Sequence, residues 1–397
     1  MGNDGDSISA VAETLHGQLS QLHQNNHVSN GTQQVSIGLI RMANINPLVA
    51  VAQRLIKLPA PDNTCIHYCV YHSRYPLAIR SHIEAKLDNV LMRKDPQSLW
   101  EQEEITSCLN KAPDIENHIF VVLASPVAEV GRDHDYDWAV VEPSSIRSII
   151  QLAGRVLRHR EPSTTIKAPN ILLLNQNYKA IKGGAICFTR PGFESKKHRL
   201  SAHDLLEILP EPHYKKIDAA PRIDWPKDCE GRTATQREQG FSRLNDLEHR
   251  ALQVRLLNED NSADLWWRHT PHWCGEVQRQ QPFRKSEKDE AYYLYVEDDY
   301  SPSKWYWLNE NVHPAKLGKP TGISISENTT TEFGKNSGFW FEQDPLSIYS
   351  HLANEFNLEL TEVSRRFGGL RITHHRRNEH TEYFYDDSMG VFQEMEN

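Results

Sequence analysis

One short segment of the chain combines arginine, glutamine and glycine at a spacing suited to phosphate chemistry. Residues 151–158 have the form Q-x-x-G-R-x-x-R. On a helix with about 100° per residue, one side carries Arg147, Gln151, Arg155 and Arg158, with Gly154 between them. Arginine has a planar, permanently charged fork that holds phosphate oxygens bidentately and can stabilise a transferring phosphoryl group. The segment is a candidate phosphate-contacting motif, although an arginine-rich helix face taken alone is usually just solvated.

The other side of the same predicted helix, over residues 145–158, is apolar. Its apolar stripe comprises Ile146, Ile149, Ile150, Ala153 and Leu157. Such a stripe packs on a sheet and turns the arginines outward. Gly154 has no side chain, so a phosphate or a partner surface can approach the backbone there.

The segment before this helix is predicted to supply a binding loop. A buried strand over residues 118–123 is followed by a short loop with Gly131 and Asp133, then by a second strand. Gly131 permits a turn that presents backbone amides to a ligand, and Asp133 can accept a hydrogen bond from a ribose or from an arginine. Each of the two residues, viewed alone, is also typical of an ordinary turn.

Strands and helices are predicted to alternate between residues 35 and 200. The short apolar, β-rich runs are 35–43, 65–71, 119–124, 138–141 and 170–174. The helical patterns between them are 47–58, 75–91 and 145–158. Strands separated by helices form βαβ units. The predicted fold class is therefore α/β, with a parallel sheet that has helices on both faces and a smaller mixed domain after it.

The 397 residues exceed what one core usually holds, about 250 residues, so several parts are predicted. Residues 1–34 are polar and are interpreted as a linker with one short amphipathic stretch at 11–22. Residues 35–200 form the α/β lobe, and 201–262 are a helical or irregular connector. Residues 263–397 form a mixed C-terminal accessory domain with six of the nine Trp, at 266, 267, 273, 305, 307 and 340, and a helix capped by Asp344.

Composition limits the classes of function. A hydrophobic content of 38% with 24% charged residues indicates a globular protein. The net charge of -9 argues against a protein that coats polyanions over its whole surface, so any nucleic-acid site has to be local. No apolar run approaches the roughly 18 residues of a membrane span, and the start lacks a secretory signal. We expect a soluble, cytoplasmic protein.

The six cysteines predict no zinc motif. They stand at positions 65, 69, 108, 187, 229 and 274, without a C-x-x-C. Cys65 and Cys69 lie in an apolar, strand-like run, where buried thiols are commoner than zinc ligands. A reducing compartment is expected.

Residues 124–160 resemble motifs V and VI of superfamily 2 helicases. The combination of E-V-G-R-D-H-D-Y-D with E-P-S-S-x-R-S-I-I-Q-L-A-G-R is similar to the helicase-nuclease family of CRISPR type I-F systems, the Ypest subtype. Upstream, VSIGLIRMANINPLV (35–49) and YHSRYPLAIRSHIE (71–84) resemble the first strand-helix unit and motif IV of that family. A weaker likeness continues through AAPRI (219–223) to the aromatic C-terminal region. The resemblance implies a second RecA-like lobe over residues 35–200.

The resemblance also implies roles for single residues. Arg155 and Arg158 would act as arginine fingers toward the γ-phosphate of ATP, whose Mg²⁺ and phosphates are held mainly by a first lobe. Gln151 and Asp133, with Gly131 and Gly154, would contact the nucleotide. The residues expected to grip the DNA backbone are Ser73, Arg74 and Ser125, although a helix cap is an equally good interpretation of Ser73 and Arg74.

Other parts of a complete motor are not found in these 397 residues. A helicase needs a glycine-rich phosphate loop with Lys-Ser/Thr and an acidic pair after a buried strand. The stretches Leu317–Pro320, Phe333–Asn336 and Asp289–Tyr292 imitate these motifs but lack their spacing and context. The His-Asp pairs at 134–135 and 203–204 are interpreted as a loop contact or a helix start, because a metal site needs further ligands. The chain is expected to begin in the linker between two lobes.

Two interpretations follow, and a third is weaker. The first is the C-terminal half of a DNA helicase-nuclease, inactive alone, whose partners are the first RecA-like lobe and nuclease domain, single-stranded DNA, the CRISPR surveillance complex and the integrase. The second is a non-catalytic module that binds DNA or the surveillance complex, with Trp and Tyr stacking on bases. The third is an RNA helicase fragment.

A basic run near the C-terminus has two interpretations. It is either a DNA-binding patch or a solvated strand, and it comprises Arg365, Arg366, Arg371, Arg376 and Arg377.

Overall fold

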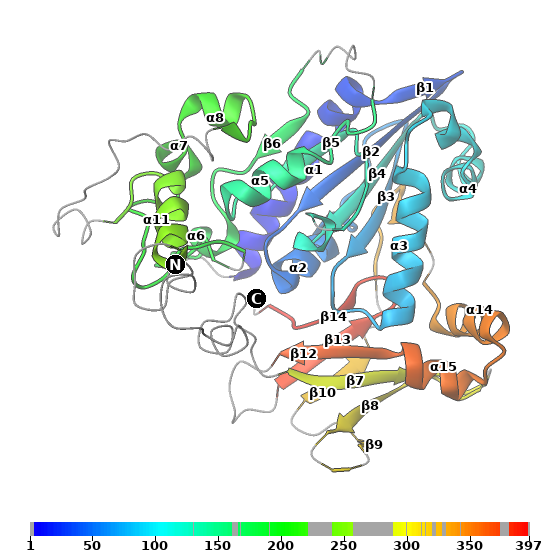
Figure 1. Cartoon of the computed structure of the whole chain (residues 1–397). Helices are drawn as coiled ribbons and strands as arrows, with labels where there is room; N and C mark the ends of the chain where they lie inside the picture. Colours follow the sequence, from blue (N-terminus) through cyan, green and yellow to red (C-terminus); the bar gives the residue numbers. More distant parts are fainter. Residues whose placement is uncertain are drawn as a thin grey trace. The chain divides into compact units, whose positions relative to one another are not determined.

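The computed structural model describes fourteen stretches of the chain. They are residues 4–129, 131–160, 166, 168–189, 191–220, 240–256, 289–298, 300–310, 312–313, 315–319, 323–327, 331–341, 343–373 and 381–395. The chain divides into two compact units (Figure 1). Unit 1 contains Met1–Val141, Gln151–Leu172 and Asp289–Asn397, and unit 2 contains Glu142–Ile150 and Leu173–Lys288.

A mostly parallel sheet forms the centre of unit 1. Its strands are β1 (Val28–Asn30), β2 (Gln33–Arg41), β3 (Thr64–Tyr71), β4 (Asn117–Ala124), β5 (Trp138–Val141), β6 (Ile171–Leu173) and β11 (Ser337–Phe339). The order is β11-β3-β4-β2-β5-β6, and β1 pairs antiparallel with β2. The predicted strands are confirmed in place and in type. The predicted α/β fold class is confirmed as well.

Burial explains why these apolar runs are strands. The side chains of β2, β3 and β4 are nearly all buried, as expected for the central strands of a parallel sheet covered on both faces. Gly38 in β2 faces its neighbour Trp138 in β5, and a Cβ at Gly38 would lie 2.1 Å from the indole ring. The indole Nε1 of Trp138 donates to Oγ of Ser36 over 3.1 Å. Glycine at position 38 is therefore a packing requirement of the sheet.

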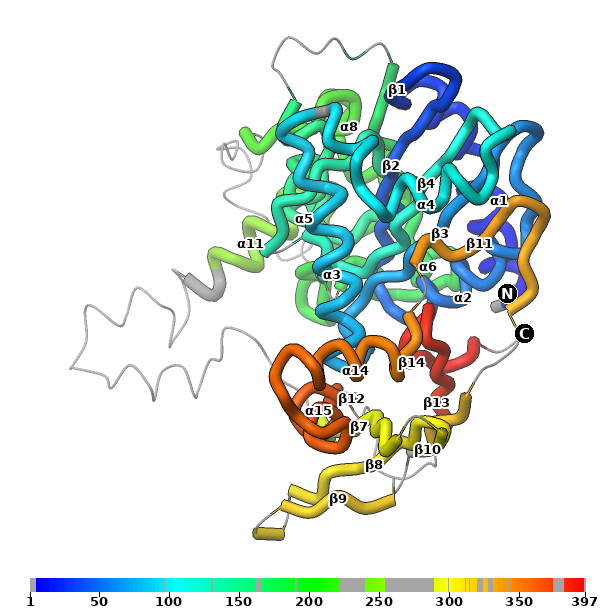
Figure 2. The backbone as a smooth tube through the Cα atoms, turned by 90° about the vertical axis from the view of Figure 1, so that its right-hand side faces the viewer, coloured from blue at the N-terminus to red at the C-terminus, as the bar shows by residue number. Residues whose placement is uncertain are grey.

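Helices cover the sheet. They are α1 (Asp4–Asn26), α2 (Ile45–Leu55), α3 (Leu77–Leu91) and α4 (Glu103–Lys111), with short 3₁₀ helices η1 (Pro96–Glu101) and η2 (Pro126–Glu129). Figures 1 and 2 show α1 and α2 on one side of the strands and α3 on the other. This arrangement confirms the prediction of helices on both faces.

The N-terminal segment is more ordered than a polar linker. The predicted amphipathic stretch at 11–22 belongs to the longer helix α1, whose buried residues recur at helical spacing: Ile8, Val11, Ala12, Leu15, Leu19 and Leu22. Such a stripe stabilises a helix by packing even where the average composition is polar. That residues 1–34 join two lobes stays a prediction.

The C-terminal residues 289–397 group with the parallel sheet in unit 1. A four-stranded antiparallel sheet has the order β12-β7-β8-β9, from β7 (Asp289–Tyr295), β8 (Lys304–Asn309), β9 (Lys316–Gly318) and β12 (Gly369–Thr373). A second small sheet has the order β10-β13-β14, from β10 (Ile323–Glu327), β13 (Thr381–Asp386) and β14 (Gly390–Phe392). The helices are α14 (Pro345–Phe356) and α15 (Leu360–Phe367), and Asp344 caps α14 by accepting from the Ser347 amide, as predicted.

This C-terminal region also contributes to the parallel sheet. Strand β11 pairs parallel with β3, and the Trp340 ring after it packs at a tilt against the Phe120 ring, with 4.7 Å between ring centroids. The Trp340 indole donates to the Glu104 carbonyl. Residues 289–397 thus belong to the same unit as the parallel sheet. A separate accessory domain that begins at residue 263 stays a prediction.

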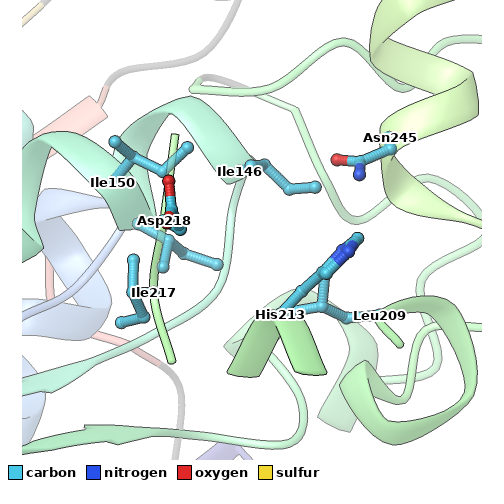
Figure 3. Close-up of a pocket in the computed structure, with 8 residues that line it drawn as sticks. Ile146, Ile150, Leu209, His213, Ile217, Asp218 and Asn245 are labelled. Atoms are coloured by element: carbon cyan, nitrogen blue, oxygen red, sulfur yellow. The ribbon is translucent and has the colours of Figure 1, made fainter. Parts of the chain in front are cut away.

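Unit 2 is small and mainly helical in its described residues. It has α6 (Tyr178–Ile181), α7 (Leu205–Ile208), α8 (Glu211–Lys215) and α11 (Leu244–Leu256) around a core that includes Phe188, Leu205 and Leu247. The buried carboxylate of Glu194 accepts hydrogen bonds from the amides of Cys187, Phe188 and Leu200. Figure 3 shows a pocket here, lined by Ile146, Leu209 and His213 among others. None of the described helices is long and apolar enough to cross a membrane.

Candidate functional site

The predicted helix with the arginine stripe is shorter than expected. Helix α5 spans Ile146–Ala153, whereas the pattern predicts a helix to residue 158. Arg155 and Arg158 therefore lie in a loop after the helix. The prediction that they form one helical stripe with Arg147 and Gln151 is wrong.

Backbone pairing with another segment ends the helix. The amide of Tyr136 donates to the Arg155 carbonyl over 2.8 Å, and the amide of Leu157 donates to the Tyr136 carbonyl over 2.9 Å. Leu157 adopts a left-handed conformation with φ of 51°. These non-local hydrogen bonds replace those of a further helical turn.

The apolar stripe shifts as a result. Ile146 and Ile149 are buried as expected, but the other buried positions are Leu152 and Val156. Ala153 and Leu157 are only half-buried. The loop geometry after Ala153 turns Val156 inward, which continued helical periodicity does not predict.

Arg158 is presented at the surface by an acidic loop residue. Its Nε donates to Oδ1 of Asp133 over 2.5 Å, and its Nη1 donates to the Gly154 carbonyl over 3.0 Å. The Arg158 side chain is 41% exposed and that of Asp133 is 52% exposed. Hydrogen bonds from Arg158 and His159 hold the pKa of Asp133 below its usual value. The structure thus brings together three of the predicted residues: Arg158, Asp133 and Gly154.

Arg155 lies in the same loop but is more enclosed. Its Nη2 donates to the Glu129 carbonyl over 3.1 Å. Its Nε is buried and meets no acceptor among the described residues. Burial, then the charge of Arg158, lowers the pKa of Arg155, although arginine keeps its proton in proteins. A buried donor without an acceptor is costly unless a ligand supplies one.

Gln151 and Gly131 are the other two residues predicted to contact the nucleotide. Gln151 is exposed on α5. Gly131 is exposed in the loop before Asp133 with φ of 74°, a conformation that favours glycine. A Cβ at Gly131 would meet nothing within 4 Å, so the backbone conformation alone explains glycine here.

Beneath the exposed pair lies a buried set of carboxylates and arginines. Asp137 accepts from the Ile37 amide, from Nη1 of Arg93 and from Nη2 of Arg160, each over 2.8 Å. Asp135 accepts from Nε of Arg160 over 3.0 Å and from the Arg158 amide over 3.0 Å. Both carboxylates and Arg93 are essentially inaccessible to water. This set, which we call the buried charge network, fixes the backbone that carries Arg158.

Sequence reasoning missed the buried charge network. The signal was present, because aspartates alternate at 133, 135 and 137 and basic residues follow at 158–160. A second buried pair was also missed: Nε of Arg41 donates to Oε1 of Glu129 over 2.6 Å. Both sets join segments far apart in sequence, so only the fold pairs them.

The residues predicted to contact DNA lie where β3 and β4 end. The Ser125 amide donates to the Tyr71 carbonyl over 3.1 Å, and Ser125 is buried. Ser73 is exposed. Arg74 is half-buried, since its Nη1 donates to Oδ1 of Asn46 over 2.7 Å and its guanidinium lies 5.6 Å from the centre of the Tyr383 ring. Only Ser73 of the three has a freely accessible side chain.

The hairpin of β13 and β14 packs against the segment that contains Ser73 and Arg74. His72 shares a hydrogen bond of 2.8 Å with the Met389 carbonyl, and Tyr75 donates to the Ser388 carbonyl over 2.8 Å. The Val391 amide donates to the Arg74 carbonyl over 2.8 Å. Gly390, with φ of 70°, has no room for a Cβ, which would lie 2.7 Å from the His72 ring. These contacts pack residues 388–391 against residues 72–75.

The sequence stretches that imitate other motifs have structural roles. His134 is buried between Asp88 and Tyr136, and Asp204 caps α7. The stretch 333–336 forms the turn before β11, where the Gly334 amide donates to the Ile56 carbonyl. Asp289 and Glu290 begin β7, and Asp289 pairs with Arg371. That these stretches are not a phosphate loop, an acidic box or a nuclease centre stays a prediction.

The basic run near the C-terminus is partly described. Arg371 forms ion pairs with Asp289 and Glu310, and Arg366 pairs with Glu362. Arg376 and Arg377, with His374 and His375, lie outside the described residues. So do Trp266, Trp267, Trp273, Cys229, Cys274 and residues 221–223. Nearby carboxylates already neutralise Arg366 and Arg371, which weakens the interpretation as a DNA-binding patch.

Comparison with known proteins gives a consistent set of relatives. Residues 34–161 match the family model of the C-terminal region of the CRISPR-associated nuclease/helicase Cas3. The chain is 44% identical over 408 residues to the nuclease/helicase Cas3 subtype I-F/YPEST of Pectobacterium atrosepticum, which covers 98% of this chain and 35% of that protein. It is 37% identical over 382 residues to the protein of the same name from Pseudomonas aeruginosa, covering 93% of this chain and 34% of that protein.

The chain thus spans about a third of the length of these curated relatives. Among solved structures, T. fusca Cas3 with ATP is similar with 20% identity and a TM-score of 0.28, over 41% of this chain and 16% of that chain.

Proposed function

Because the chain belongs to the Cas3 family of CRISPR-associated proteins, we propose that it is the C-terminal part of an ATP-dependent helicase-nuclease that moves along single-stranded DNA. In this proposal unit 1 contains the second RecA-like lobe. It supplies arginines and DNA contacts, and a first lobe supplies the ATP-binding loop. The partners are that first lobe, the nuclease domain, single-stranded DNA, the CRISPR surveillance complex and the integrase.

The observation that carries the proposal is the way Arg158 is presented. Its guanidinium is exposed, yet the backbone beneath it is fixed by Asp135, which accepts from the Arg158 amide. Asp133 and the Gly154 carbonyl engage Nε and Nη1 and leave Nη2 without an acceptor among the described residues. A nucleotide phosphate held by another lobe can therefore replace Asp133 at little cost, because an exposed ion pair is worth about 0–1 kcal/mol.

Arg155 fits a supporting role in the same proposal. Its buried Nε has no acceptor within the part of the chain that the structure describes, so a phosphate oxygen that reached it would accept an otherwise missing hydrogen bond. Two guanidinium groups facing a transferring phosphoryl group stabilise the charge that develops on its oxygens. Gln151 and the backbone at Gly131 and Gly154 are the remaining proposed nucleotide contacts.

The carboxylates near these arginines do not fit a magnesium site. Asp135 and Asp137 are buried and their oxygens accept from arginine and amide donors, and Asp133 is engaged by Arg158 and His159. Mg²⁺ prefers carboxylates that remain open to it and to several waters. We therefore assign Mg²⁺, with most ATP contacts, to the first lobe.

The test compares the 397-residue chain alone with the same chain joined to a first lobe of the family. We expect no ATP turnover from the chain alone and DNA-stimulated turnover from the joined protein. Turnover by the chain alone that disappears in Arg158→Ala would overturn the proposed division of labour. Binding of single-stranded DNA without turnover in the joined protein would favour the non-catalytic interpretation instead.

A further inference from the structure

Three side chains with metal-ligand chemistry meet where strands β3 and β4 begin, away from the arginine loop. Cys65 and His67 are two residues apart on β3, so they share one face of the sheet. His118 on β4 is directly opposite Cys65 in the strand register. The ligand atoms of the three residues lie within 4.8 Å of one another. We call Cys65, His67 and His118 the strand-edge triad.

The two histidines face each other with the nitrogens that a metal would use. Nε2 of His67 lies 3.1 Å from Nδ1 of His118, and the two rings are stacked nearly parallel. The other nitrogen of His118, Nε2, lies 3.2 Å from the Ile115 carbonyl, a distance that suits donation to this oxygen. With its proton on Nε2, His118 has a lone pair on Nδ1 that can bind a metal. A ligating histidine usually has such an outer hydrogen bond, which fixes its tautomer and orientation.

The triad is enclosed by its surroundings. Cys65 and His118 are buried and His67 is half-buried. Phe120 stacks on His67 at 4.5 Å. On the adjoining strand, Gly338 of β11 is paired with His67. The triad is thus half-enclosed beside the strand that the C-terminal region adds to the parallel sheet.

We propose that the strand-edge triad binds one transition-metal ion, with zinc as the best match. A thiolate with two imidazoles is a ligand set that zinc accepts in tetrahedral geometry, at about 2.3 Å from sulfur and about 2.0 Å from nitrogen. Three protein ligands leave one position for water or a further ligand. Bonds of these lengths place the ligand atoms of a tetrahedral ion about 3.3–3.5 Å apart. The two imidazole nitrogens lie 3.1 Å apart, and all three ligand atoms lie within 4.8 Å of one another.

The protonation balance of binding is simple. Cys65 loses one proton to solvent when its thiolate binds, which is the one proton released per metal ion. In the pair of histidines, the proton that lies between Nε2 of His67 and Nδ1 of His118 moves to Nδ1 of His67, so both facing nitrogens offer lone pairs. No oxidant or reductant takes part.

A structural consequence follows for the C-terminal region. A metal at the triad would tie β3 to β4 next to the pairing of β3 with β11, at the point where residues 337–339 return to the sheet. The site is independent of nucleotide chemistry, so it does not depend on the function proposed above.

The experiment uses the 397-residue chain with any affinity tag removed. The protein is stripped with a chelator, checked for folding by circular dichroism and titrated with Co²⁺, which takes zinc sites and is coloured. We expect one equivalent to give the visible bands of tetrahedral cobalt and a thiolate-to-cobalt charge-transfer band, both lost on adding one equivalent of Zn²⁺. Folded protein without these bands would overturn the proposal with no variant needed.

Variants then locate the site. Cys65→Ala is matched with Cys69→Ala, because Cys69 lies on the same strand and is also a buried free thiol. We expect Cys65→Ala and His118→Ala to weaken Co²⁺ binding by more than the roughly 10- to 100-fold that loss of an outer partner causes. Cys69→Ala should retain the bands. Retention of the charge-transfer band in folded Cys65→Ala would show that the metal is held elsewhere.

Discussion

The exposed pair Arg158–Asp133 and the buried charge network beneath it use the same residue types for different purposes. In the pair, both side chains are more than a third exposed, so water screens the attraction between the Arg158 guanidinium and the Asp133 carboxylate. In the network, Asp137 has side-chain accessibility of 1% and accepts three hydrogen bonds. Only two to four residues separate the aspartates along the chain. Exposure and partners, more than residue type, therefore distinguish an arginine that can reach a ligand from one that holds the fold.

The largest effect that this comparison predicts is on turnover in a complete motor joined to a first lobe. Arg158→Ala should slow ATP hydrolysis by about 10³ to 10⁵, the range for loss of an arginine finger. Arg158→Lys should be nearly as slow, because lysine lacks the bidentate fork. ATP binding should survive. Steady-state hydrolysis and nucleotide binding measure the two effects separately.

Arg147→Ala is the matched control for this prediction. Arg147 lies one turn before Gln151 on α5, and its guanidinium packs over the Phe193 ring at 5.9 Å. We expect little change in hydrolysis. Equal slowing by Arg147→Ala and Arg158→Ala in folded protein would mean that the segment acts as a general basic face.

The next effect is on stability. Asp137→Ala leaves Arg93 and Arg160 buried without their shared acceptor, so it should lower the free energy of unfolding by about 3–5 kcal/mol. Urea unfolding followed by circular dichroism measures this. A loss below about 1 kcal/mol would show that the network is not structural, and the contrast with the exposed pair would fail.

A third prediction concerns pH and rests on a buried group that stays neutral. Burial lowers the pKa of His72 from 6.5 to about 3. The unfolded chain takes up a proton on this group below about pH 6.5, whereas the folded protein does not, so stability is present above that pH and falls as pH decreases toward 3. Between pH 8 and pH 5 the loss should be about 2 kcal/mol.

The variant His72→Gln should flatten this part of the pH profile while it lowers stability at pH 7. Melting temperatures between pH 5 and pH 8 test it. An unchanged slope in His72→Gln would assign the acid sensitivity to other groups, such as His23, whose pKa is lowered to about 4.

The smallest effect is expected for Asp133. Asp133→Asn removes an exposed ion-pair partner, so the free energy of unfolding should change by less than about 1 kcal/mol. Added salt should also weaken the Arg158–Asp133 ion pair of the wild-type protein, because ions in solution screen exposed charges. The same urea measurement as for Asp137→Ala checks it, and a loss as large as that of Asp137→Ala would contradict the distinction between the two sets.

Local patterns in the sequence were sufficient for the main elements. The apolar runs of β2, β3, β4 and β5 predicted a parallel sheet, because strands buried on both faces are apolar without alternation. The cap and proline at 344–345 predicted the start of α14. The glycine and arginine positions of residues 151–158 indicate a phosphate-contacting segment, which stays a prediction. Each of these signals lies within a few residues of the feature that it predicts.

Tertiary structure decided what depends on residues far apart in the chain. Helix α5 ends at Ala153 because Tyr136 pairs with residues 155–157, and helical periodicity contains no information about that partner. The same holds for Arg74, which Asn46 and Tyr383 enclose, and for strand β11, which joins β3 from more than 250 residues away. Sequence by itself determined the central strands of the parallel sheet and which residue types are available for phosphate chemistry, because both follow from residues that are close together in the chain. The fold decided which of those residues face water, because long-range hydrogen bonds and burial determine the local geometry around each one.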